Sequence, residues 1–181
     1  MKFTTEELIF ATNAKVLKNN AQGRNFSIST DTRTINYENV YIGLKGENFD
    51  GENFIPKALE AGVKAYFTTK GTVLDGADLV LQVEKPIIAY LQLAKLCLNK
   101  ISPKVIALTG SSGKTTTKEM LTSVCKQQFR TFSTPLNHNN EVGFCQTILS
   151  MPRDTQVLIL EMGMRGLGEI ELLSKYSNPD I

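Results

Sequence analysis

The sequence predicts an α/β protein with two domains, a small α/β domain followed by a parallel-sheet domain that the 181 residues contain only in part. Three observations predict this fold class. Strand-like and helix-like segments alternate along the first part of the chain, and an apolar strand restarts directly after Ser102-Pro103. The apolar run 105–108 then leads into a glycine-rich turn and a helix. We therefore expect a first domain at residues 1–101 and an incomplete second domain at residues 102–181.

A capped helix opens the first domain. Thr5 precedes Glu6 and Glu7, so a hydroxyl cap is followed by acidic residues in the first turn, which the helix dipole favours. The remaining elements follow from apolar period, turn residues and helix-end residues. They are strands over 39–44, 63–69 and 79–83, a helix around 55–59 ended by Gly62, a turn at Asp75-Gly76, and a helix from Pro86 to Lys100.

The second domain repeats strand and helix in α/β order. Predicted strands lie at 105–108, 131–134 and 157–160, and predicted helices at 118–127, 141–149 and 168–176. Met120, Leu121 and Val124 share one face of the first of these helices. Residues 178–181 read as the start of a further strand, and a doubly wound domain needs more strands than these.

Composition limits the class of protein. The apolar fraction is 41%, and no apolar run approaches the roughly 20 residues that cross a bilayer. A net charge of +2, with scattered Lys and Arg, does not favour a nucleic-acid partner. Cys97, Cys125 and Cys145 are widely spaced, and His138 is the single histidine, which suits reduced thiols and excludes a multi-histidine metal site. We expect a cytoplasmic protein.

The strongest chemical motif is Thr109-Gly110-Ser111-Ser112-Gly113-Lys114-Thr115-Thr116. Glycines let the backbone wrap closely around phosphates, and the N-terminus of the following helix offers free N–H donors. Lys114 can reach the terminal phosphates of ATP, and the hydroxyl of Thr115 can bind Mg²⁺. Leu108 stands where the general P-loop pattern has its first glycine, so a chance glycine turn is the alternative. The flanking strand and helix argue against that alternative.

Two further segments of the second domain are candidates for the site. Glu161 directly follows the apolar run 157–160, and a carboxylate at the end of a parallel strand can hold the Mg²⁺ of a nucleotide. A helix-capping or solvent-facing glutamate is an equally good interpretation of that spacing. The segment 137–143 carries Asn137, His138, Asn139 and Asn140, but asparagines are also ordinary turn residues.

A hydroxyl–carboxylate–guanidinium cluster occurs in the first domain, at Ser29-Thr30-Asp31-Thr32-Arg33. Such a cluster can bind a uridine or a phosphate, because arginine binds phosphate through two parallel hydrogen bonds. From the chemistry of these residues alone, a surface turn with a local salt bridge is the favoured interpretation.

Together these motifs resemble the Mur ligase family, the ATP-dependent amide ligases of peptidoglycan precursor synthesis. That family's own P-loop lacks the general first glycine. Within the family, the chain is most similar to the ligases that add D-alanyl-D-alanine to UDP-N-acetylmuramoyl-tripeptide. The segments that carry the resemblance are 30–33, 44–51, 109–120, 137–143 and 161–170.

The resemblance implies a mechanism and a set of roles. ATP phosphorylates the substrate carboxylate, an amine attacks the acyl phosphate, and phosphate leaves as the amide forms. Lys114 and Glu161 are the implied catalytic residues, and Thr115 and Glu161 the implied Mg²⁺ ligands. Residues implied to bind the nucleotide are Gly110, Ser111, Ser112, Gly113, Lys114, Thr115, Thr116, Asn137 and Asn140. Those implied to hold the UDP-sugar end are Ser29, Thr30, Asp31, Arg33, Lys45 and Gly46.

The resemblance also implies parts that the 181 residues lack. They are the rest of the central domain, with a lysine that relatives carbamoylate, and a C-terminal domain that completes the ATP site and brings the amine. A monomer working in cell-wall biogenesis, on which cell shape and division depend, is implied as well. Other interpretations are a sister Mur ligase, a folylpolyglutamate synthase, a P-loop kinase, or a nucleotide-binding or interaction module without catalysis.

We expect the purified 181-residue chain to show no ligase turnover, because the implied amine-binding domain is missing. An assay for ADP release and amide formation with UDP-N-acetylmuramoyl-tripeptide, D-alanyl-D-alanine and ATP checks this. Measurable amide formation contradicts the expectation.

Overall fold

The computed structural model describes residues 1–46, 49–135, 138–164 and 166–181. They form two compact units, Met1–Leu93 and Ala94–Ile181, each built on its own sheet. The mixed α/β class with parallel-rich sheets is confirmed. The division between the units falls inside helix α3 (Pro86–Ile101), and a domain limit after residue 101 stays a prediction.

A six-stranded sheet forms the first unit, in the order β1-β3-β4-β5-β6-β2. Its four central strands are parallel, and the strands at its two edges are antiparallel to their neighbours. The central strands are β3 (Asn25–Ser29), β4 (Asn39–Ile42), β5 (Ala65–Thr68) and β6 (Leu79–Gln82), and the edge strands are β1 (Phe3–Thr4) and β2 (Lys15–Asn19). The carboxyl ends of all four parallel strands therefore meet at one edge of the sheet.

Both faces of the first sheet are buried. On one face, Tyr41, Tyr66 and Val80 pack in a cluster with Ile55 and Ala58 of helix α2 (Ile55–Glu60). The residues that alternate with them along the strands, such as Ile42 and Phe67, are also fully buried. Burial on both faces explains why these strands appear in the sequence as continuous apolar runs.

Three of the six strands in this sheet were missed by the sequence analysis. Strand β3 does carry a period-two signal, since Phe26 is buried and Ile28 is half-buried. Strand β2 gives a weak signal because it is an edge strand, and its Val16 is exposed. Strand β1 has only two residues, and pairing with β3 is what makes it a strand.

Helix α1 (Thr5–Thr12) begins one residue earlier than predicted, because its cap is Thr4 rather than Thr5. The hydroxyl of Thr4 accepts a hydrogen bond from the Glu7 amide at 3.1 Å, and the Glu7 carboxylate accepts one from the Thr4 amide at 3.0 Å. This reciprocal pair is a capping box. The Thr5 hydroxyl is used elsewhere, because it donates to the carbonyl of Ala21 at 3.0 Å.

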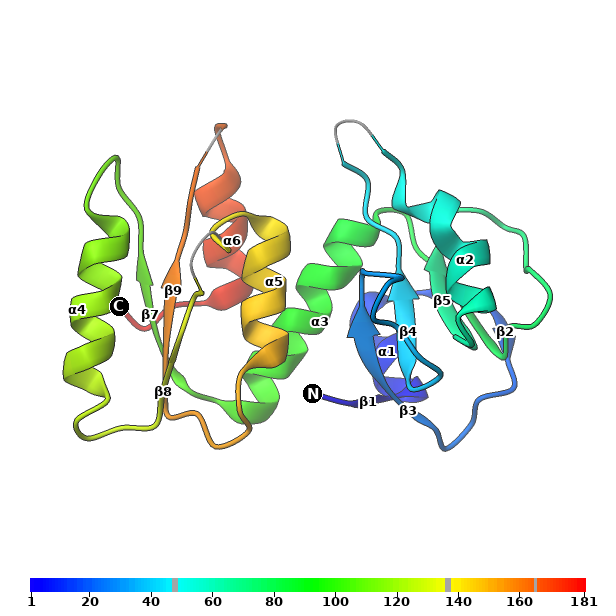
Figure 1. Ribbon diagram of the computed structural model, residues 1–181, viewed down its shortest axis with the longest axis horizontal. Coiled ribbons are helices and arrows are strands. Elements are labelled where there is room, and N and C mark those ends of the chain that lie inside the picture. The colour runs from blue at the N-terminus through cyan, green and yellow to red at the C-terminus, as the bar shows by residue number, and fades with distance from the viewer. Residues whose placement is uncertain (47–48, 136–137, 165) are drawn as a thin grey trace. The chain divides into compact units, whose positions relative to one another are not determined.

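The second unit contains a parallel three-stranded sheet in the order β7-β9-β8. Helix α4 lies on one side of this sheet, and helices α5 and α6 lie on the other (Figure 1). The strands are β7 (Lys104–Leu108), β8 (Thr131–Ser133) and β9 (Val157–Glu161), and the helices are α4 (Lys114–Cys125), α5 (Glu141–Ser150) and α6 (Glu169–Ser177). All six were predicted, with shifted ends.

The end of the chain runs beside β7. The Ile181 amide donates to the Val105 carbonyl at 3.3 Å, and the Ala107 amide donates to the Ile181 carbonyl at 2.9 Å. This is the bonding pattern of a strand parallel to β7. The predicted start of a further strand agrees with these bonds.

Helix α4 differs from the prediction in its start and in its packed face. The helix starts at Lys114 instead of residue 118, and two members of its predicted apolar face, Met120 and Val124, are 66% and 70% exposed. The buried residues of this helix are Lys118 and Thr122. The side of α4 that packs against the sheet therefore carries two buried polar residues beside the half-buried Leu121.

Helix α3 buries apolar residues along its length, including Leu91, Ala94 and Cys97. Its final turn leads into Ser102, which has a φ of 56°, and then into the proline that precedes β7. Within the described residues, none of the helices combines the length and the apolar character that crossing a membrane demands.

The backbone at Gly43 packs directly against the backbone at Gly51, beside the carboxyl edge of the first sheet. A Cβ atom on Gly43 would lie 2.5 Å from the carbonyl carbon of Gly51. We predict that Gly43→Ala lowers the free energy of unfolding by about 2 kcal/mol, because backbone on both sides would have to move. Urea unfolding followed by circular dichroism measures the change. Gly71→Ala is the matched control, since its Cβ would meet only the Gln82 side chain at 4.0 Å, and equal losses in both variants would contradict the prediction.

Candidate functional site

The glycine-rich loop joins the carboxyl end of β7 to the first turn of α4. Gly110 and Gly113 have φ values of 151° and 76°, which favour glycine. Gly113 is the N-cap residue of α4 and offers no side chain to cap the helix. The amides of the first turn thus have no side-chain cap, and the helix dipole makes this end attractive to anions.

The side chain of Lys114 lies across the glycine-rich loop. The Lys114 ammonium donates to the Gly110 carbonyl at 2.7 Å, and this contact is exposed to solvent. Ser111, Ser112 and Thr116 are exposed beside it. A phosphate on the first turn of α4 would therefore meet both backbone amides and an accessible ammonium group.

Glu161 lies at the end of β9 and faces the same helix. Its side chain is 7% exposed, and its Oε1 accepts a hydrogen bond from the Thr115 hydroxyl at 3.0 Å. The alternative of a solvent-facing glutamate is therefore wrong. A hydroxyl and a carboxylate side by side are hard oxygen donors of the kind that Mg²⁺ prefers.

No cluster of three or more metal-binding side chains was found in the described parts of the chain. A nucleotide-bound Mg²⁺ takes one or two protein ligands and draws the rest from phosphates and water. Thr115 and Glu161 are the two protein groups that could hold it.

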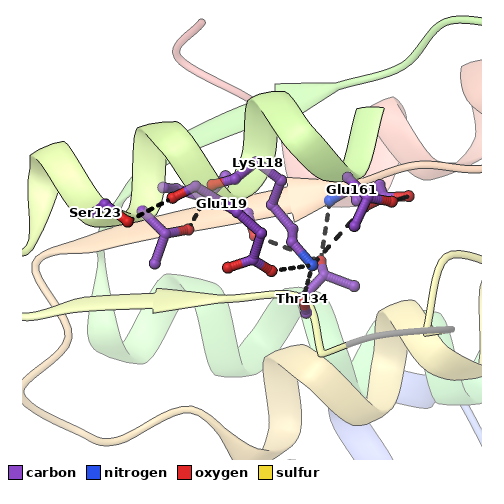
Figure 2. A network of polar contacts seen from close by, with 8 residues as sticks. Lys118, Glu119, Ser123, Thr134 and Glu161 are labelled. Carbon is purple, nitrogen blue, oxygen red and sulfur yellow. Dashed lines mark hydrogen bonds and ion pairs between the residues drawn. The ribbon is translucent and has the colours of Figure 1, made fainter. Parts of the chain in front are cut away.

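A buried lysine lies behind Glu161, and no role for it was predicted from the sequence. The Lys118 ammonium is 1% exposed and donates to the Thr134 carbonyl at 2.8 Å. It also lies 3.0 Å from Glu119 Oε1 and 3.8 Å from Glu161 Oε2, and Figure 2 shows these contacts converging on its nitrogen. A lysine in a helix is normally solvated, so only its position one turn after Lys114 could have drawn attention to it.

The asparagine-rich segment is only partly described. Asn137 lies outside the described residues. The Asn140 side chain caps α5 by accepting from the Gly143 amide at 2.9 Å, and the Asn139 carbonyl accepts from the Gly163 amide at 2.7 Å. These are structural contacts, and nucleotide binding by Asn137 and Asn140 stays a prediction.

The predicted substrate residues of the first unit lie at the carboxyl ends of β3 and β4. Asp31 and Arg33 form a salt bridge at 2.6 Å, with a second hydrogen bond from Arg33 Nε at 2.9 Å. The Arg33 side chain is 82% exposed. The local salt bridge that the sequence favoured is therefore present, and Ser29 accepts from the Asp31 amide at 3.2 Å.

Tyr41 connects this cluster with the loop after β4. Burial, with smaller contributions from Asp31 and Asp50, raises the pKa of Tyr41 to about 12. Its hydroxyl donates to the Gly51 carbonyl at 2.8 Å. The segments around Asp31 and Asp50, far apart in the sequence, thus lie near the same buried ring.

A cavity of about 420 Å³ opens at this edge of the first sheet. Its lining includes Lys45, Asp50, Glu52, Thr69 and Lys85. Glu52 is 6% exposed, and its carboxylate accepts from both the amide and the hydroxyl of Thr69. This pair was not predicted from the sequence, because a glutamate in a polar loop gives no sign that it is buried.

Two other predicted residues complete this edge. Thr30 follows β3 and is half-buried. Gly46 donates its amide to the Phe49 carbonyl at 2.9 Å, which closes the loop after β4. Among the described residues, the predicted substrate residues lie in the first unit and the predicted nucleotide residues in the second. Their roles remain predictions.

A strand, a glycine loop and a helix N-terminus beside a buried carboxylate define a P-loop nucleotide-binding protein. Family models match most of the chain: the Mur ligase middle domain matches residues 108–181, and the model described as Mur ligase family, catalytic domain matches residues 27–101. The chain belongs to the Mur ligase family.

Individual relatives agree with this assignment. The UDP-N-acetylmuramoyl-tripeptide–D-alanyl-D-alanine ligase of Bacillus subtilis (strain 168) is 43% identical over 154 residues, which are 84% of this chain and 34% of that protein. A crystal structure of MurF from Acinetobacter baumannii matches with a TM-score of 0.91 at 32% identity, covering 99% of this chain and 40% of that one. MurF ligase from Thermotoga maritima in complex with ADP matches with a TM-score of 0.78 at 34% identity, covering 86% of this chain and 36% of that one. The chain spans about a third of the length of the curated relatives it matches.

We predict that Asp31 remains ionised well below pH 4. Hydrogen bonds from the Arg33 side chain and then from its backbone hold the pKa of Asp31 at about 2. Because the pKa is lowered in the folded chain, the pair's contribution to stability is complete above the unfolded pKa and is lost as the pH falls towards 2. Carboxyl ¹³C NMR titration measures this pKa. In Arg33→Gln it should rise towards about 4, and an unchanged value would contradict the assignment.

Proposed function

We propose that this chain supplies the ATP-phosphate site and the UDP-substrate site of a ligase that adds D-alanyl-D-alanine to UDP-N-acetylmuramoyl-tripeptide. The observation that carries the proposal is the P-loop, with Lys114 across it and the Thr115–Glu161 contact beside it. The names of the curated relatives support the choice of substrates. The reaction then belongs to peptidoglycan precursor synthesis in the cytoplasm.

The chemistry requires two group transfers. The γ-phosphoryl group passes from ATP to a carboxylate oxygen of the tripeptide, giving an acyl phosphate and ADP. The amine of D-alanyl-D-alanine then attacks the carbonyl carbon, and phosphate leaves as the amide forms. Neither transfer needs a covalent bond to the protein, so positioning and neutralisation of charge are the main tasks of the site.

The residues of the second unit suit these tasks. Lys114 and the first-turn amides of α4 would bind phosphate oxygens, with the ammonium exchanging its Gly110 contact for a phosphate. Thr115 and Glu161 would hold Mg²⁺. When bound, Mg²⁺ neutralises phosphate charge and orients the transferred group.

The carboxyl edge of the first sheet would hold the UDP end of the substrate. Arg33 and Lys45 are exposed cations at the ends of neighbouring strands, and the cavity beside Lys45 has several hydrogen-bonding side chains in its lining. Cationic side chains and strand ends of a parallel sheet together suit a nucleoside diphosphate.

We predict that Lys114→Ala weakens ADP binding in the presence of Mg²⁺ by about tenfold or more, because a hydrogen bond to a charged phosphate is lost. The same variant should leave the dissociation constant for UDP-N-acetylmuramoyl-tripeptide unchanged. Arg33→Ala should give the reverse result. Isothermal titration calorimetry of the purified chain with each ligand measures both constants.

Lys126→Ala is the control, since Lys126 is an exposed lysine at the far end of the same helix. It should leave both constants unchanged. The proposal fails if the unaltered chain binds neither ligand, or if Lys114→Ala and Lys126→Ala bind ADP equally well.

A further inference from the structure

Lys118 is a buried cation surrounded by oxygen atoms from three elements. Its ammonium contacts the Thr134 carbonyl after β8, Glu119 on its own helix, and Glu161 at the end of β9 (Figure 2). A charge that is 1% exposed is costly unless it is paired and hydrogen-bonded. Removing one partner of a buried pair leaves the other charge uncompensated, which is strongly destabilising.

The two oxygens of Glu161 face different partners. Oε1 accepts from the Thr115 hydroxyl at 3.0 Å, on the side of the glycine-rich loop. Oε2 lies 3.8 Å from the Lys118 ammonium, on the side of β8. The carboxylate therefore lies between the loop and the buried lysine, with one oxygen for each.

Thr134 binds both the backbone of Glu161 and the side chain of Lys118. Its hydroxyl accepts a hydrogen bond from the Glu161 amide at 2.9 Å, and its carbonyl accepts from Lys118 at 2.8 Å. Thr134 is itself 2% exposed, and its amide donates to the Ile159 carbonyl at 2.9 Å. Lys118, Thr134 and Glu161 thus form one closed unit, in which each member contacts the other two.

We propose that Lys118 is a positioning residue for Glu161. Its ammonium holds Oε2 on the β8 side by electrostatic attraction, so that Oε1 stays beside Thr115. Glu161 and Thr115 would then share Mg²⁺. The effect of Lys118 on Mg²⁺ binding rests on the proposed function. The positional role itself rests only on the contacts within the closed unit.

The role requires a cation at this place. An apolar side chain of the same length could fill the space under α4, but it would leave Oε2 buried without a counter-charge. Partners that orient a metal ligand from behind affect metal affinity by about 10–100-fold in characterised sites. Lys118 is placed to act in this way, because its ammonium contacts Glu161, the proposed Mg²⁺ ligand, on the side away from the glycine-rich loop.

The test compares ADP binding with and without Mg²⁺ in Lys118→Met, which keeps an unbranched apolar stem. The gain in ADP affinity that Mg²⁺ provides should fall by about tenfold or more, while affinity for metal-free ADP changes little. Glu119→Gln is the matched control, since it removes the exposed carboxylate partner of Lys118 and leaves Glu161 intact. The control should keep the gain. A purely structural role for Lys118 would lower both affinities together, and that result overturns the proposal.

A second measurement does not depend on the nucleotide. Lys118→Met, Glu161→Gln and the double variant are compared by their thermal unfolding midpoints, Tm. Because the two side chains interact, the double variant should lose less Tm than the two single losses added together. Additive losses overturn the positioning role even if Mg-ADP binds. If Mg²⁺ does not change the ADP affinity of the unaltered chain, the proposed function is wrong. Non-additive Tm losses would in that case still support the contact between Lys118 and Glu161.

Discussion

The parallel pairing of β7 with β9 determines where the candidate nucleotide site lies. Its register places Leu108 opposite Glu161, and the Met162 amide continues the pairing by donating to the Leu108 carbonyl at 2.9 Å. The glycine-rich loop and the carboxylate therefore leave the sheet at the same edge and at the same level. A slip of one residue would turn the Glu161 side chain to the other face of the sheet, away from α4. Every contact of Thr115 and Lys118 with this carboxylate depends on that register.

Placing a carboxylate there has a consequence for the helix above it. Glu161 and Lys118 are both buried, so helix α4 needs polar groups on the side that faces the strand ends. Lys118 and Thr122 occupy that side, and Met120 and Val124 are turned towards solvent. The apolar pattern of this helix therefore misleads, because the usual rule that the apolar face packs against the sheet gives way to the needs of a buried ion pair.

Features that depend on local sequence could be predicted, and features that depend on contacts between distant segments could not. The P-loop could be predicted from the sequence, because its function lies in local backbone conformation and glycine spacing. Glu161 was a candidate for the site because it ends a buried strand, although its spacing suited a helix-capping or solvent-facing glutamate equally well. Lys118 and Thr134 could not be predicted, since their role arises from contacts between segments distant in sequence. For the same reason nothing in the sequence showed that Glu52 is buried against Thr69, or that β2 pairs with β6.

Two cations assigned to phosphates in the proposal already have oxygen partners, and the partners differ. Lys114 donates to a neutral carbonyl, which a phosphate can replace at little cost. Arg33 is bound to the Asp31 carboxylate, a much stronger competitor for the same donors. Asp31, however, contacts only the Nε and Nη2 edge of the guanidinium among the interactions of the described residues. A diphosphate could therefore add to the remaining edge without breaking the pair. The salt bridge would then orient Arg33 for the ligand, as Lys118 orients Glu161 in the second unit.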